Sequence, residues 1–106
     1  FAIKDLKLDE DIAELILIRK LADLVARIKE TFPWTKDAPE VIQDVVVDMC
    51  YQLGINGFSK FKKTIYLLET EQYQEASVEM LDSLWAKQTP NRAKELSEEV
   101  RAVPSN

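Results

Sequence analysis

The apolar side of the first predicted helix changes faces midway along its length. With roughly 100° per residue on a helical wheel, the early apolar residues share one face: Leu8, Ile12, Leu15 and Ile16. The later ones share the opposite face: Leu17, Leu21, Leu24, Val25 and Ile28. A helix that packs on one core keeps a single apolar stripe. A stripe that changes faces therefore predicts a helix lying between two bodies, one under each half.

Only the second half of this helix has apolar partners downstream in the chain. We therefore expect the first half to face either a part of the protein outside these 106 residues or a partner protein. The alternative is a helix buried on all sides within one core.

Capping and breaking residues predict where the helices begin and end. The first helix is expected over residues 9–30, because Asp9 and Asp11 suit a helix N-terminus and Pro33 follows. A second helix is expected to take Asp37 as its N-cap and to stop at Gly54. Apolar residues, including the valine run at 45–47, lie on most of its sides, which is typical of a central helix.

The rest of the chain predicts shorter helices. After a tight turn at 54–57, helices are expected at about 59–69, 72–80 and 81–85, and a last one at 89–100. Thr89 suits the N-cap of the last helix and Pro90 its first turn. Because strand signals are nearly absent, the predicted fold class is all-α, a compact bundle of five to six helices with a long first helix.

Charge and composition narrow the classes of function. The net charge is −5, so neither nucleic acid nor an anionic membrane is an expected partner. No apolar run approaches the ~18 residues of a membrane span, and stable membrane insertion is not expected. The one basic cluster, Lys60, Lys62 and Lys63, is interpreted as a solvated helix end, with a binding patch as the alternative.

The chain has no histidine and one cysteine, Cys50. Catalytic Cys–His and Ser–His–Asp arrangements are therefore excluded within these residues. We expect no metal site and no cofactor, since one thiol without imidazole makes a poor transition-metal site. Cys50 lies in an apolar run and is predicted to be a buried structural thiol.

Several motifs resemble one enzyme family. Residues 85–93 read W-x-x-Q-T-P-N-R-A, which resembles the C-terminal motif of the phage T4 type of lysozyme, glycoside hydrolase family 24. Residues 51–54 resemble that family's aromatic-Gln-apolar-Gly helix end, and residues 73–76 its aromatic-x-Glu-Ala turn. Gly57 and Phe61 fall in the same register, and the resemblance covers about nine tenths of the chain.

The resemblance implies the C-terminal helical lobe of an α+β enzyme. Residues 9–30 would be the helix between two lobes, residues 31–106 the helical lobe, and residues 1–8 a remnant of, or link to, the N-terminal lobe. That missing lobe would pack on Leu8, Ile12, Leu15 and Ile16. The family's catalytic glutamate lies in that lobe, so no catalytic residue is assigned here, and the chain alone is expected to be inactive.

The implied activity is a muramidase, a glycosidase that cleaves peptidoglycan between N-acetylmuramic acid and N-acetylglucosamine. Glycoside hydrolysis needs two catalytic groups, and the resemblance places both outside these residues. The lobe present here would bind the glycan strand and its peptide stem. Register with family contacts predicts the substrate-binding residues Tyr51, Gln52, Thr64 and Glu79, although Glu79 stands where the family has asparagine. An ordinary helix end is the alternative interpretation of Tyr51 and Gln52.

The C-terminal motif is expected to support the cleft. Trp85 is predicted to stack in the core and Gln88 to bond to the backbone. Thr89 is expected to cap its helix, while Asn91 and Arg92 could reach either lobe.

The family further implies a monomer made in the host cytoplasm that acts on peptidoglycan in the periplasm after holin-dependent release. The alternative is a non-enzymatic, lysozyme-derived helical module that binds a partner through the first face of the 9–30 helix. The codons upstream of Phe1 would separate the two.

Overall fold

The computed structural model of the chain describes residues 12–104, and their side chains from residue 19 onward. Over this range no strand occurs, and the predicted all-α class is confirmed. The elements are α1 (Ile12–Thr31), the 3-10 helix η1 (Pro33–Asp37), α2 (Glu40–Ser59), α3 (Lys62–Glu69), α4 (Tyr73–Leu81), α5 (Leu84–Gln88) and α6 (Pro90–Ala102).

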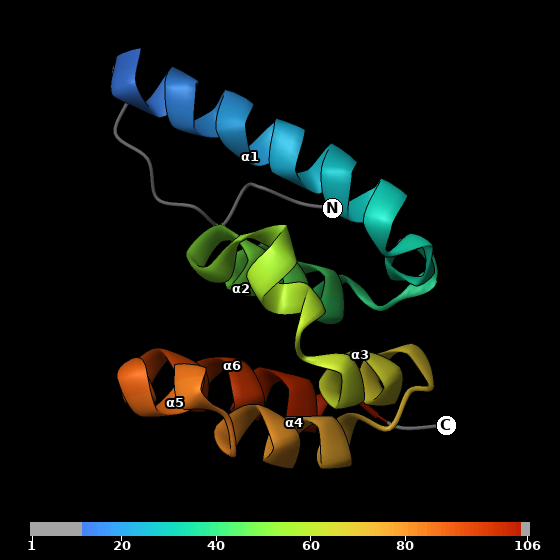
Figure 1. Cartoon of the computed structure of the whole chain (residues 1–106). Coiled ribbons are helices and arrows are strands. Elements are labelled where there is room, and N and C mark those ends of the chain that lie inside the picture. The colour runs from blue at the N-terminus through green and yellow to red at the C-terminus, as the bar shows by residue number, and fades with distance from the viewer. Residues whose placement is uncertain (1–11, 105–106) are drawn as a thin grey trace.

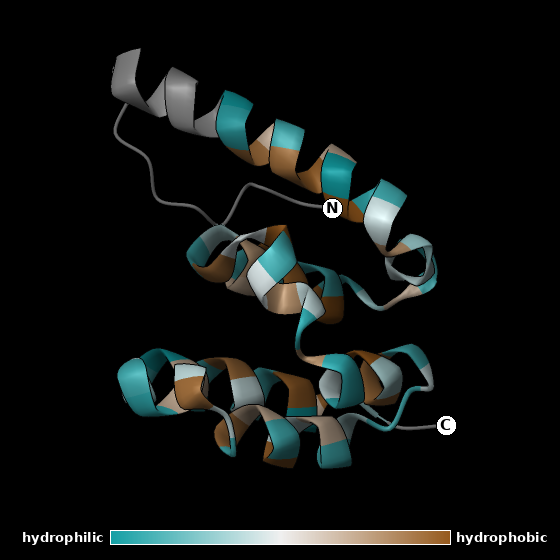
Figure 2. Cartoon of the chain, in the orientation of Figure 1, coloured by the Kyte–Doolittle hydropathy of each residue, from teal (hydrophilic) through white to brown (hydrophobic). Residues whose placement is uncertain are grey.

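The helices are arranged around α2. Figure 1 shows α1 crossing one side of α2, and α3 to α6 gathered on the other side. Within that second group α4 packs against both α3 and α6. The valine-rich segment of α2 is helical, as predicted, and Ile42, Val45, Val46 and Met49 are all fully buried. Figure 2 shows the apolar segments of α1 on the side that faces α2. Together with the full burial of these four side chains, this confirms the prediction of a central helix.

The second half of α1 packs on this core. Leu21, Val25 and Ile28 are buried, whereas Arg27 on the opposite side is exposed. The predicted apolar face of this half is therefore confirmed. Leu8 lies outside the described residues, and so do the side chains of Ile12, Leu15 and Ile16, so the change of face stays a prediction.

The start of α2 differs from the prediction. Asp37 ends η1 instead of capping α2, and Pro39 takes the N-cap position without a side-chain hydrogen bond. The reason lies in the turn before it, which is held by two other side chains. The Thr35 hydroxyl donates to the Phe32 carbonyl over 2.7 Å, and the Gln43 amide donates to the Thr35 carbonyl over 2.8 Å.

Gly54 was predicted to end the second helix, but in the structure it only interrupts α2. Gly54 has φ 77° and ψ 162°, a conformation outside the helical region, yet the chain resumes its helix directly and continues to Ser59. Burial drives this continuation, because Ile55 and Phe58 belong to the core. The predicted tight turn at 54–57 is therefore wrong, and α3 begins at Lys62 rather than at residue 59.

Candidate functional site

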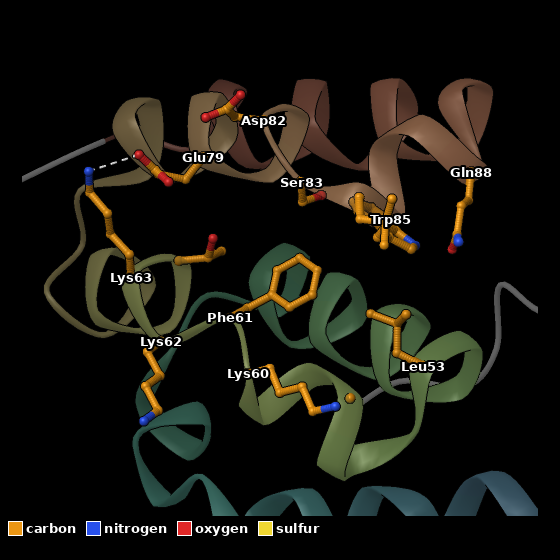
Figure 3. A pocket seen from close by; sticks show the side chains of 13 residues that line it. Leu53, Lys60, Phe61, Lys62, Lys63, Glu79, Asp82, Ser83, Trp85 and Gln88 are labelled. Carbon is orange, nitrogen blue, oxygen red and sulfur yellow. Dashed lines mark ion pairs between the residues drawn. The ribbon is translucent and has the colours of Figure 1, made fainter.

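An open hollow of about 490 Å³ lies where the end of α2, the start of α3 and the α4–α5 segment meet (Figure 3). Its lining combines apolar side chains, lysines, carboxylates and hydroxyls. The lining residues are Leu53, Gly57, Lys60, Phe61, Lys62, Lys63, Thr64, Glu79, Asp82, Ser83, Leu84, Trp85 and Gln88. The volume of this open hollow lies within the range of small-ligand pockets.

A row of aromatic rings connects the hollow with the core. The Phe32 and Phe58 ring centroids lie 5.4 Å apart, those of Phe58 and Phe61 6.2 Å, and those of Phe61 and Trp85 6.3 Å. Such contacts add to the burial energy of each ring. The break at Gly54 precedes the short helical turn that carries Phe58, and Phe61 follows as the N-cap residue of α3. The apolar floor of the hollow is thus held by the core itself.

One ion pair spans the edge of the hollow. The Lys63 ammonium lies 2.9 Å from a Glu79 carboxylate oxygen, which joins α3 to α4. The hydrogen bond and the negative charge of Glu79 raise the pKa of Lys63 above its ordinary value. Figure 3 shows this pair at one end of the lining, with Gln88 at the other.

A buried hydroxyl also lines the hollow. Thr64 is 4% exposed, and its hydroxyl has no hydrogen-bond partner among the residues that the structure describes. It lies in the first turn of α3, whose N-cap residue Phe61 provides no side-chain cap. The first backbone N–H groups of a helix lack partners within it, so this corner of the hollow offers unused hydrogen-bonding capacity.

A polar network stands beside the hollow and links three helices. The Trp85 indole donates to the Gln52 side-chain oxygen over 3.1 Å, and the Gln52 amide donates to Asp48 over 2.8 Å. Asp48 also forms an ion pair with Arg92, and Arg92 donates to Glu95 over 3.0 Å. The network around the Asp48 carboxylate therefore links three positions that are widely separated in the sequence: Gln52, Trp85 and Arg92.

The structure gathers most of the residues that the sequence singled out, but not all. Thr64, Glu79, Trp85 and Gln88 line the hollow, and Gln52 and Arg92 join it through the network. The remaining three do not line it: Tyr51, Thr89 and Asn91. Substrate contact by any of these residues stays a prediction.

Within the C-terminal motif, Trp85 is 3% exposed and packs on Phe61, as predicted. Gln88 is instead exposed on the hollow, and its side chain forms no hydrogen bond with the backbone within the described range. Thr89 holds the N-cap position of α6, but its hydroxyl donates backward to the Trp85 carbonyl over 3.0 Å rather than capping.

Sequence reasoning missed Asp48 and the part played by the lysines. Asp48 is a single carboxylate within an apolar stretch, and only its spacing of four residues before Gln52 hinted at an interaction. Lys60 and Lys63 were seen as a basic cluster, but their place on the hollow depends on how α4 packs against α3.

Cys50 is buried, as predicted, and burial raises the pKa of its thiol to about 12. Within residues 12–104 no three His, Cys, Asp or Glu side chains gather into a group that could hold a metal ion. No helix in that range is long and apolar enough to cross a membrane.

Comparison with known proteins gives partial matches. A protein named probable T4-type lysozyme 1, from Dictyostelium discoideum, is 34% identical over 58 residues, which are 55% of this chain and 34% of that protein. Probable T4-type lysozyme 2 from the same organism is 40% identical over 48 residues, 45% of this chain and 28% of that protein. No family model matches. The matched part of this chain spans about a third of these relatives, and over about half of its own length the chain is similar to proteins named T4-type lysozymes.

Proposed function

We propose that the chain is the helical, substrate-binding lobe of a T4-type lysozyme, a muramidase that cleaves the β-1,4 bond between N-acetylmuramic acid and N-acetylglucosamine. The observation that best supports this proposal is the hydrogen bond from the Trp85 indole to the Gln52 side chain beside the hollow. It joins the two segments that carry the family motifs. The similarity to two named lysozymes over part of the chain supports it as well.

The contribution of this lobe is binding, not bond cleavage. Binding energy gained away from the scissile bond orients the sugar for attack. The hollow, with its aromatic floor and polar rim, would hold a part of the wall polymer, and the network through Asp48 would fix Trp85 and Gln52 in position. A further lobe, outside these residues, would supply the catalytic carboxylic acid.

Sedimentation with purified peptidoglycan sacculi tests the binding role. We expect the 106-residue chain to pellet with sacculi and not with cellulose. Gln52→Ala should weaken pelleting because it leaves the Trp85 indole unpaired, whereas Gln74→Ala, at an exposed position on α4, should not. A chain that stays in the supernatant with sacculi would contradict the proposal.

A test of the proposed muramidase activity needs the complete gene product, because the catalytic lobe would lie outside these residues. We expect that product to lyse chloroform-treated Gram-negative cells, and the present chain to leave them intact. A full-length product that binds sacculi but never lyses cells would favour the alternative of a non-enzymatic module.

A further inference from the structure

The polar network beside the hollow depends on one carboxylate with two separate partners. Oδ1 of Asp48 accepts from the Gln52 amide nitrogen over 2.8 Å, and Oδ2 pairs with the Arg92 guanidinium. The Asp48 side chain is 21% exposed, so both bonds lie at a partly buried place. Each carboxylate oxygen therefore holds its own donor, one on α2 and one on α6, through a charge-assisted hydrogen bond.

These partners leave the Gln52 amide one orientation. The Trp85 indole N–H can only donate, and an ionised carboxylate can only accept. The Gln52 oxygen therefore faces Trp85, at 3.1 Å, and its nitrogen faces Asp48. The reversed amide would place N–H against N–H and oxygen against oxygen. Because Trp85 is buried, an indole without its acceptor would carry the cost of an unsatisfied buried polar group.

The two bonds leave part of the hydrogen-bonding capacity of Gln52 unused. Its amide keeps one N–H group and one oxygen lone pair, and the residue is exposed. Because the amide has one orientation, the remaining donor and acceptor are held at set places. Without Asp48 the amide nitrogen would lose its acceptor, and an exposed glutamine side chain would regain rotational freedom. The order of this surface therefore depends on a residue that does not line the hollow.

We propose that Asp48 is a positioning residue, which holds the Trp85 indole and the exposed groups of Gln52 in place through the Gln52 amide rather than through its ion pair with Arg92. The positioning follows from the hydrogen bonds alone. Its importance for binding of the cell wall rests on the proposed function.

Hydrogen exchange of the indole N–H groups, measured by nuclear magnetic resonance on the 106-residue chain, tests this route. The Trp85 signal reports on the bond to Gln52, and the Trp34 signal, from η1, serves as the internal reference. Gln52→Ala should speed exchange of the Trp85 indole about fivefold, the effect of one lost hydrogen bond. Asp48→Ala should speed it about threefold, but should add nothing in the Gln52→Ala background.

Further variants separate the amide from the ion pair and from net charge. Arg92→Gln removes the ion pair and should leave the exchange rate of the Trp85 indole unchanged. Gln52→Glu should raise that rate, because like charges four residues apart on a helix repel each other. Adding Asp48→Asn should restore slow exchange, since the new amide can donate to the new carboxylate. Adding Asp23→Asn instead, at an exposed position on α1, gives the same net charge and should restore nothing.

All rates are compared at a temperature where thermal unfolding shows every variant to be folded. The inference is overturned if Asp48→Ala leaves the Trp85 rate unchanged, if its effect is the same with and without Gln52, or if Asp48→Asn fails to rescue Gln52→Glu. Pelleting with sacculi decides the proposed function separately, and Asp48→Ala should weaken it as Gln52→Ala does. If Asp48→Ala speeds indole exchange but pellets like wild type, the positioning is supported while the proposed function loses support.

Discussion

Two buried threonines provide a matched test of the packing described above. Thr35 and Thr64 are both almost fully buried, but only the Thr35 hydroxyl has a partner among the described residues, the Phe32 carbonyl at 2.7 Å. Replacing threonine by valine exchanges the hydroxyl for a methyl group and keeps the β-branched shape. The two substitutions should therefore change the free energy of unfolding in opposite directions.

The magnitudes follow from known costs. Thr35→Val loses a buried hydrogen bond, and about 1 kcal/mol of stability with it, since the Phe32 carbonyl keeps its bond from the Thr35 backbone N–H. Thr64→Val removes an unsatisfied hydroxyl and buries a methyl group, which should stabilise the fold by about 1 kcal/mol. The two variants should thus differ by about 2 kcal/mol.

Urea unfolding followed by far-ultraviolet circular dichroism measures this difference. With a slope of about 1.5 kcal/mol per molar urea, the midpoints of the two variants should lie about 1.3 M apart, with wild type between them. If Thr64→Val destabilises the protein as much as Thr35→Val does, the Thr64 hydroxyl has a partner in the folded state. The reasoning about the hollow would then be wrong.

Three further predictions concern the core and the backbone. Met80→Ala should lower the free energy of unfolding by about 2–5 kcal/mol, because the side chain is fully buried; Val78→Ala on the same helix, 65% exposed, is the control and should change it little in the same urea titration. Gly54→Ala should cost about 1–3 kcal/mol from its backbone conformation alone, since a Cβ there meets nothing within 4 Å; an unchanged melting temperature would contradict this. Cys50 should not react with a thiol reagent at pH 8 without urea. Its pKa is about 12 in the folded protein and 9.0 for a thiol that is not buried. Its contribution to stability should therefore be complete below pH 9 and fall as the pH rises toward 12, a loss that Cys50→Ala should not show.

Local patterns predicted most of the helices. The apolar stretch around Val45 predicted a buried central helix, and a threonine followed by proline predicted the last helix, which begins at Pro90. The errors arose where tertiary packing outweighs a local signal. Gly54 is a strong helix terminator, yet the burial of Ile55 and Phe58 makes a further helical turn favourable.

The site was less predictable than the fold. Motif resemblance found Thr64, Glu79 and Trp85, which the structure brings to one hollow. Asp48 was missed, because its link to Arg92 spans 44 residues and leaves no periodic trace in the sequence. Whether a buried hydroxyl has a partner likewise depends on side chains from other elements, which no local pattern encodes.

The bond from the Trp85 indole to Gln52 joins positions 33 residues apart, and the Arg92 ion pair reaches back further still. During synthesis, Gln52 and Asp48 therefore leave the ribosome before Trp85 and Arg92 do. The polar network cannot form until both of these partners have emerged, so the middle of α2 must first fold without it.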